Sequence, residues 1–230
     1  MMVKVTTPEG GQIEMGVPIA RITKVAFGEP PELAKATAAA AACNTPEVLS
    51  LTEAYVAKQG EFGDLPGSFW PQMAGLRLLA LSSAGKNAEA STLAGQIGAI
   101  KAPGSESLSR AGTLFGPLAS GDTEAVVVGA KPIPRIGGDQ GSALAQLALG
   151  RALLLKKDYA GALRAFLTVK VFYPSAVLLQ PAALMGAANA YLGLKDEKRA
   201  VQTLNDISEL YPASSQAPEA KKIAAGLSST

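Results

Sequence analysis

The side chains that carry most enzymatic and metal chemistry are scarce in this sequence. It contains no histidine and a single cysteine, which excludes a Ser–His–Asp triad and any metal site built on histidines or on a cysteine cluster. Cys43 closes an alanine-rich stretch, and we expect it to be a small buried core residue rather than a reactive thiol. We therefore expect no metal and no cofactor.

Other reactive residue types occur, but their spacing favours structural roles. The run at 137–142, GGDQGS, lacks the lysine of a phosphate-binding loop, and we interpret it as a flexible linker. Adjacent carboxylates such as Asp196 and Glu197 stand at an expected helix start, where they serve as solvated charges and cap partners. Trp70 could anchor a ligand, but a core position at the entry of a helix is the simpler interpretation.

Composition excludes two further classes of function. The formal net charge is +2 with both signs mixed along the chain, so there is no basic stripe of the kind that binds nucleic acid. No apolar run reaches the roughly 18 residues of a transmembrane helix. The alternatives that remain are a protein-binding scaffold and a hydrolase. The hydrolase would use a carboxylate or Ser–Lys site in the irregular middle of the chain, 105–141.

An internal repeat identifies the elements that must position any site. Corresponding residues recur 38 positions apart, as in Asp158 and Asp196, Ala162 and Ala200, and Pro174 and Pro212. A fixed period of this size indicates stacked helical hairpins. Apolar residues at helical spacing predict helices over 143–156 and 159–172, with a tight turn between them.

The repeat resembles the tetratricopeptide repeat. That family places a small residue at position eight, Ala at position 20, a large apolar residue at 24 and Pro at 32. One unit fills these positions with Gly150, Ala162, Phe166 and Pro174, and the next with Ala188, Ala200, Leu204 and Pro212. Each unit is about four residues longer than the usual unit of about 34. The extra residues follow Tyr-Pro, and this spacing is similar to repeats of bacterial envelope proteins such as the Tol–Pal coordinator and outer-membrane assembly lipoproteins.

The resemblance implies an all-α, right-handed superhelix of hairpins and a non-enzymatic role in holding another protein or peptide. In this family the first helix of each unit lines a concave face. The implied contact residues are Leu147, Arg151, Leu154, Met185, Asn189 and Leu192, with Leu144 and Ala182 on the same face. If that face is open, Arg151→Glu with Asn189→Ala should weaken partner binding at little cost in melting temperature. Alternatively, the apolar members pack against the preceding helices.

The remaining segments divide as follows. Residues 1–28 predict a β appendage, with a hairpin of Val3–Thr7 and Gln12–Met15 whose exposed edge could pair two copies into a homodimer. Residues 29–130 predict degenerate hairpins, 131–141 a Pro/Gly linker, and 142–230 the two clear units with a capping helix. Helices are expected over 32–43, 46–59, 70–83, 87–100, 105–118 and 123–129, with Thr45 as the cap of the second.

The first residues carry no apolar signal region. We interpret the start as a truncated or mature form of an envelope or periplasmic protein. The alternative is a cytoplasmic protein.

Overall fold

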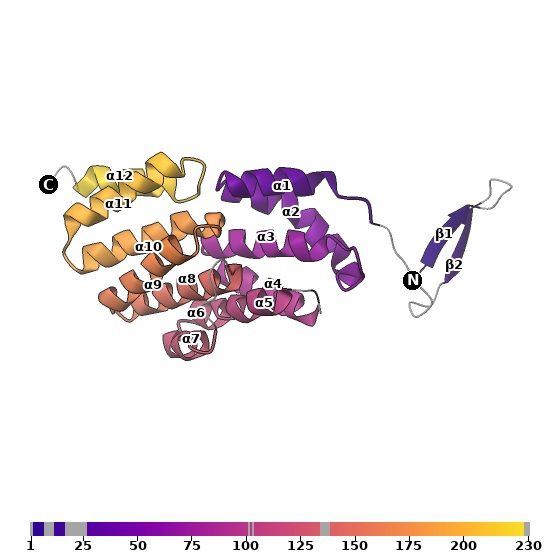
Figure 1. The fold of residues 1–230 in the computed structure, drawn as a ribbon, viewed down its shortest axis with the longest axis horizontal. Helices are drawn as coiled ribbons and strands as arrows, with labels where there is room; N and C mark the ends of the chain where they lie inside the picture. The colour runs from indigo at the N-terminus through magenta and orange to yellow at the C-terminus, as the bar shows by residue number, and fades with distance from the viewer. Residues whose placement is uncertain are drawn as a thin grey trace.

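The computed structural model describes residues 2–6, 12–16, 27–100, 102, 104–133 and 139–227 of the chain. From residue 27 onward the described part is helical and contains no strand, which confirms the all-α prediction (Figure 1). The strand β1 (Met2–Thr6) pairs antiparallel with β2 (Gln12–Gly16), with Val3 opposite Met15. The expected hairpin at Val3–Thr7 and Gln12–Met15 extends to Thr7, which lies outside the described residues.

The helices of the first half are α1 (Pro31–Ala41), α2 (Thr45–Gln59), α3 (Trp70–Ser83), α4 (Asn87–Ala99), α5 (Ser105–Gly112), α6 (Phe115–Ser120) and α7 (Thr123–Ala130). Those of the second half are α8 (Gln140–Leu155), α9 (Tyr159–Phe172), α10 (Gln180–Gly193), α11 (Glu197–Leu210) and α12 (Ala217–Leu227). Short 3-10 turns, η2 (Gly60–Phe62) and η3 (Val177–Leu179), follow α2 and precede α10.

Consecutive helices form antiparallel hairpins, and the turn within each hairpin has the same backbone conformation. In each, a residue with positive φ precedes the N-cap of the second helix: Cys43 (55°), Gly85 (76°), Gly121 (79°), Lys157 (61°) and Lys195 (60°). The N-cap amide then bonds to the carbonyl five residues back, as Asp158 does to Leu153 and Asp196 to Tyr191, both at 2.9 Å. The same turn conformation therefore recurs from the first hairpin to the last.

The second helices are capped by side chains, with one exception. Asn44, Asp122, Asp158 and Asp196 each accept a hydrogen bond from the backbone amide three residues later. Lys86 holds the equivalent position without a side-chain cap. The cap of α2 is thus Asn44, 3.3 Å from the Glu47 amide, and the prediction of Thr45 was wrong because Thr45 already lies within the helix.

The expected helix at 105–118 is broken in two. The turn at Thr113 and Leu114 separates α5 from α6, and Pro117 stands in the first turn of α6. In a continuous helix the ring of Pro117 would clash with the carbonyl of Thr113, four residues earlier. The third hairpin therefore has a bent first arm and, in α7, a short second arm.

Small residues set the spacing of the best-formed hairpins. Phe166 on α9 is 1% exposed and lies between α8 and α10. A Cβ atom on Gly150 would come within 2.6 Å of the ring, and one on Gly186 would be closer still. The large residue at 166 and the glycines opposite it are complementary, and Gly150 is one of the small residues that the repeat pattern predicts at a close helix crossing.

Stacking places the first helices of successive hairpins next to one another. Helix α3 contacts α1 and α5, α5 contacts α8, and α8 contacts α10. The apolar core runs through these contacts from Leu33 to Ala190, and a smaller cluster joins α10, α11 and α12. Figure 1 also shows the loop between α11 and α12 beside the end of α1, although these segments are far apart in the sequence.

Candidate protein-binding groove

On α8 the central residue of the predicted contact face is Arg151, and its side chain is bonded to the protein's own backbone. Arg151 donates from Nη1 to the carbonyl of Ser82 at 2.7 Å and from Nη2 to the carbonyl of Ser83 at 3.2 Å. Its guanidinium also lies 5.8 Å from the ring centre of Phe115. Burial lowers the pKa of Arg151 to about 10, so the group is still a cation at neutral pH. A cation at a helix C-terminus complements the negative end of the helix dipole.

Other contacts close the same region. Gln216, from the loop before α12, donates from Nε2 to the carbonyl of Ser83 at 2.8 Å. The thiol of Cys43, which follows α1, donates to the carbonyl of Val177 in η3 at 3.2 Å. The ends of α1 and α3 therefore pack against segments that precede α10 and α12. We call this contact region, made by Cys43, Ser82, Ser83, Arg151, Val177 and Gln216, the closure.

The closure corrects the expectation for Arg151. An exposed arginine was expected, whereas the structure makes Arg151 a half-buried contact between α8 and α3. Leu147 is 0% exposed and Met185 9% exposed, so the alternative of packing against neighbouring helices describes these two residues. Leu154 and Leu192 are half-buried and Asn189 is exposed. The structure thus does not present the six residues as one open face.

An open groove instead lies on the first helices of the N-terminal hairpins. It has a volume of about 760 Å³ and runs between α1 and α3, reaching α5 and the start of α8. Exposed or half-buried residues that line it are Glu29, then Ala34, Thr37, Ala38 and Ala41 of α1, Pro71, Gln72 and Leu76 of α3, Leu108 of α5, and Gln140. We call this surface the inner groove.

Helix α1 explains why the inner groove is open. Its buried side carries Leu33, Ala36, Ala39 and Ala40, whereas its exposed alanines face the groove and project little beyond the backbone. Gly75 of α3 adds no side chain to the floor. Among the described residues that line the groove, Glu29 is the one that carries a charge. The groove can therefore bury apolar atoms of a ligand without desolvating many charges.

Sequence reasoning missed this groove although a signal for it exists. Counting back from Ala90 as the twentieth position, as from Ala162 in the clear unit, gives Gln72 and Gly75 the second and fifth positions. These are the positions of Leu144 and Leu147 on α8. The same repeat positions were considered on α8 and α10, where Leu147 and Met185 are buried.

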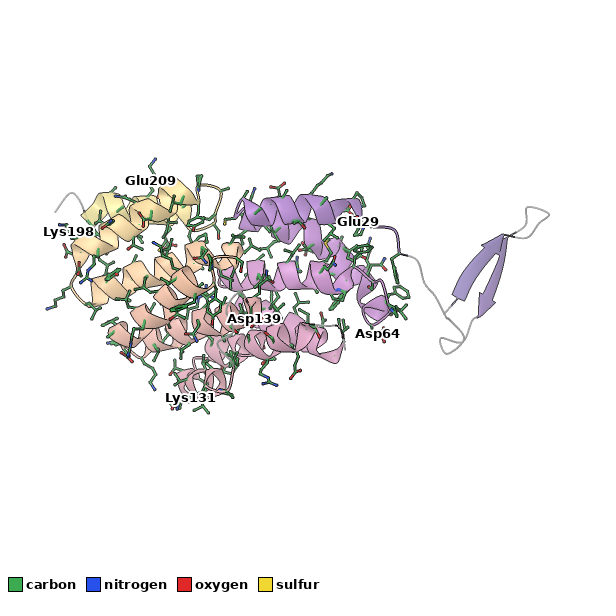
Figure 2. All side chains as sticks on the ribbon, viewed as in Figure 1. Glu29, Asp64, Lys131, Asp139, Lys198 and Glu209 are labelled. Atoms are coloured by element: carbon green, nitrogen blue, oxygen red, sulfur yellow. The ribbon has the colours of Figure 1, made fainter. Side chains whose placement is uncertain are left out.

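The middle of the chain brings Ser107 and Asp139 together. Figure 2 labels Asp139 within the helical part of the protein. Ser107 Oγ lies 2.9 and 2.8 Å from the two carboxylate oxygens of Asp139, and Ser142 donates to the same carboxylate from its amide and hydroxyl, both at 2.6 Å. Asp139 is the N-cap of α8, so residues 139–142 begin a helix and are not part of a flexible linker.

The electrostatics of this cluster favour capping over catalysis. Burial alone would raise the pKa of Asp139, but hydrogen bonds from Ser142, Ser107 and backbone amides outweigh it and hold the pKa below its usual value. A carboxylate stabilised in this way is a weak base. Among the described residues, neither Ser107 nor Asp139 hydrogen-bonds to a lysine, so these two residues do not form the Ser–Lys pair of the alternative hydrolase.

Two residues weighed as functional candidates lie in the core. Cys43 is 2% exposed and forms no disulfide. Trp70 begins α3, is also 2% exposed, and donates a hydrogen bond from its indole N–H to the carbonyl of Val56 at 2.9 Å. Both core predictions are confirmed. No helix in the described part of the chain is long and apolar enough to cross a membrane. Within the same residues no three His, Cys, Asp or Glu side chains group as metal ligands.

Comparison of the sequence with protein-family models, with curated proteins and with solved structures gives no match.

Proposed function

We propose that this protein is a non-enzymatic scaffold whose helical hairpins form a right-handed, tetratricopeptide-like stack that holds a segment of another protein. The observation that carries the proposal is the inner groove, an apolar channel along the first helices of successive hairpins. The recurring hairpin turn and the pairing of Phe166 with Gly150 and Gly186 support the family resemblance.

The lining of the inner groove indicates the kind of segment it holds. Small side chains at Ala34, Ala38 and Ala41 leave room for large apolar side chains of a ligand. Gln72 and Thr37 are exposed and can hydrogen-bond to the ligand backbone. An apolar peptide with few charges fits this combination.

The proposal is tested by blocking the groove. Ala38→Arg places a long cation in the channel, and Ala160→Arg makes the same change at an exposed position of α9. A photo-crosslinking residue at Thr37 should capture a specific protein in extracts of the source organism. Ala38→Arg should abolish this capture and Ala160→Arg should not, with both variants keeping a wild-type circular dichroism spectrum. Equal capture by the two variants would rule out the inner groove as the binding site.

We also propose an envelope or periplasmic location, supported by the Tyr-Pro spacing of the repeats. Fractionation of the source cells checks it, and recovery in the cytoplasmic fraction would reject it.

A homodimer through β1 and β2 is a further proposal that rests on the strand pairing. Deleting residues 1–28 should then convert a dimer to a monomer in light scattering without lowering the melting temperature of the helices.

A further inference from the structure

A second groove lies on another side of the N-terminal hairpins, between the second helices α2 and α4. Its volume is about 950 Å³, and α3 forms part of its floor. Buried apolar side chains line the bottom: Val56, Trp70, Leu81, Leu93 and Ile100. We call this surface the outer groove. It shares no lining residue with the inner groove.

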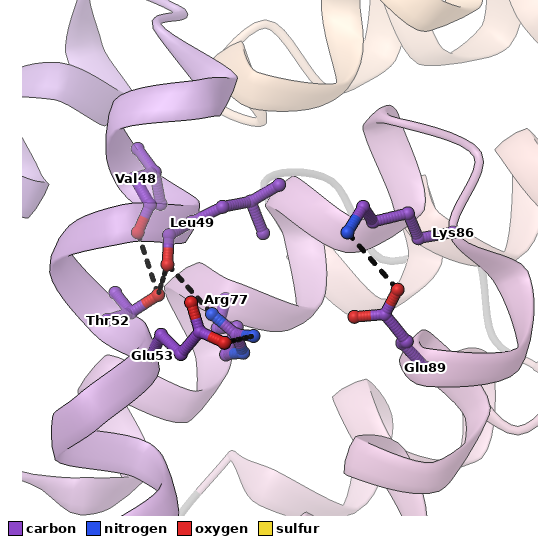
Figure 3. A network of polar contacts seen from close by, with 7 residues as sticks. All are labelled: Val48, Leu49, Thr52, Glu53, Arg77, Lys86 and Glu89. Carbon is purple, nitrogen blue, oxygen red and sulfur yellow. Dashed lines mark hydrogen bonds and ion pairs between the residues drawn. The ribbon is translucent and has the colours of Figure 1, made fainter.

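Carboxylates surround the outer groove. Glu53 on α2, Glu61 and Asp64 after α2, and Glu89 on α4 are all exposed and line it. Figure 3 shows Glu53 and Glu89 on its two sides, with Arg77 of α3 between the helices. The lining also contains two cations, Lys58 and Arg77. Among the described residues, these four carboxylates outnumber Lys58, Arg77 and the Lys86 that pairs with Glu89, so the groove is locally negative although the formal charge of the whole chain is +2.

The carboxylates are available to a ligand, whereas Arg77 is not. Arg77 donates from Nη1 to the carbonyl of Leu49 at 2.8 Å, and its side chain is only 15% exposed. Its contact with Glu53 is long, 3.9 Å, and the Glu53 side chain is 72% exposed. Glu61 and Asp64 form no ion pair among the described residues.

The remaining carboxylate has a replaceable partner. Glu89 pairs with Lys86 at 3.2 Å, and both side chains are about half exposed, 52% and 50%. A solvent-exposed pair of this kind contributes about 0–1 kcal/mol. A guanidinium from a ligand can therefore take the place of Lys86 and form two parallel hydrogen bonds with the Glu89 carboxylate.

We propose that the outer groove binds a basic peptide segment in which arginines or lysines alternate with apolar residues. The apolar residues would lie on the floor formed by Trp70, Leu81 and Ile100, and the cations would meet the carboxylates of the rim. Charge complementarity of this sort sets specificity and association rate. This binding is independent of the inner groove and would be a second docking surface on the same scaffold.

Peptide binding can be followed by the fluorescence emission of Trp70. This residue is the only tryptophan of the sequence, and it lines the floor of the outer groove. The probe is a tryptophan-free peptide of alternating arginine and leucine with Gly-Ser spacers, and its glutamate counterpart is the control ligand. The basic peptide should shift Trp70 emission saturably. Affinity should fall at least roughly tenfold between about 0.05 and 0.5 M salt, because exposed charges are screened. The glutamate peptide should produce no saturable shift.

Two matched sets of variants distinguish the effect of the charge around the outer groove from the effect of the net charge of the chain. Neutralising the rim with Glu53→Gln, Glu61→Gln, Asp64→Asn and Glu89→Gln should weaken binding roughly tenfold or more. Glu106→Gln, Glu197→Gln, Glu209→Gln and Glu219→Gln change the net charge equally at exposed sites elsewhere and should leave it unchanged. Equal losses in the two sets, or equal binding of the acidic peptide, would overturn the proposal. Ala38→Arg in the inner groove should not affect this titration, so the two proposals fail separately.

Discussion

The guanidinium of Arg151 donates a hydrogen bond to the carbonyl oxygen of Ser82 at 2.7 Å, across 69 residues of sequence. The same side chain reaches Ser83, whose carbonyl also accepts from Gln216. No described carboxylate forms an ion pair with Arg151. Backbone carbonyls at the end of α3 accept hydrogen bonds from its guanidinium instead, so this contact holds α8 to α3.

Arg151→Gln should lower the free energy of unfolding by about 2 kcal/mol, because hydrogen bonds to a charged group contribute about 1.5–3 kcal/mol. Urea denaturation measures the change. Arg164→Gln is the matched control, since Arg164 is exposed on α9 and a surface change stays within about 0.5 kcal/mol. Equal effects of the two substitutions would show that Arg151 does not hold α8 to α3.

Cys43 should report opening of the closure. Its thiol is 2% exposed and bonds to Val177, and burial raises its pKa, so the reactive thiolate is scarce in the folded protein. A maleimide should label it slowly in the wild type and several-fold faster in Arg151→Gln under native conditions. Because the chain has no other cysteine, mass spectrometry follows this site alone. Unchanged labelling rates would separate Arg151 from the contact at Cys43.

Gly141→Ala should destabilise the protein by about 1–3 kcal/mol, the usual cost of overpacking. A Cβ atom at this position would approach the Ser107 backbone carbonyl carbon to 2.6 Å, where α8 crosses α5. Gly95→Ala in α4 is the opposite case, because nothing lies within 4 Å of its Cβ position. That change should stabilise the protein by about 0.5–1 kcal/mol. Thermal unfolding of both variants tests the pair, and a stable Gly141→Ala protein would contradict the tight crossing.

Asp139 should contribute stability that depends on pH. Its pKa is lower in the folded state than its usual value, so the contribution is present above the ordinary aspartate pKa of about 3.9 and is lost as pH falls through the folded pKa. Asp139→Asn should therefore be less stable than the wild type at pH 7, and the difference should shrink in acid. Urea denaturation at a series of pH values measures it. A difference that stays constant in acid would mean that the carboxylate charge plays no part.

Local patterns predicted much of this fold. The helices at Trp70–Ser83 and Tyr159–Phe172 have the bounds that apolar spacing and turn residues indicate, and the small residue Gly150 opposite Phe166 follows from the repeat. These features are decided by residues close together in the sequence. The break at Thr113 also has a local cause, Pro117, whose position favoured two helices over one.

The closure could not be predicted in this way. Whether Arg151 meets solvent or Ser82 depends on the curvature summed over the hairpins between them, which no single motif encodes. Gln216 and Ser83 are 133 residues apart, and neither residue type suggests its partner. The inner groove had a local signal in Gln72 and Gly75 of α3, but its openness depends on the short exposed alanines of α1, which belong to another hairpin.

The closure also changes how the chain should unfold. In a linear array each repeat contacts only its neighbours, so either end can fray while the rest stays folded. Here the first two hairpins share contacts with η3 and with the segment before α12, so neither end can detach without breaking those contacts. These contacts couple the two ends of the helical part, so its hairpins should unfold in one cooperative thermal transition.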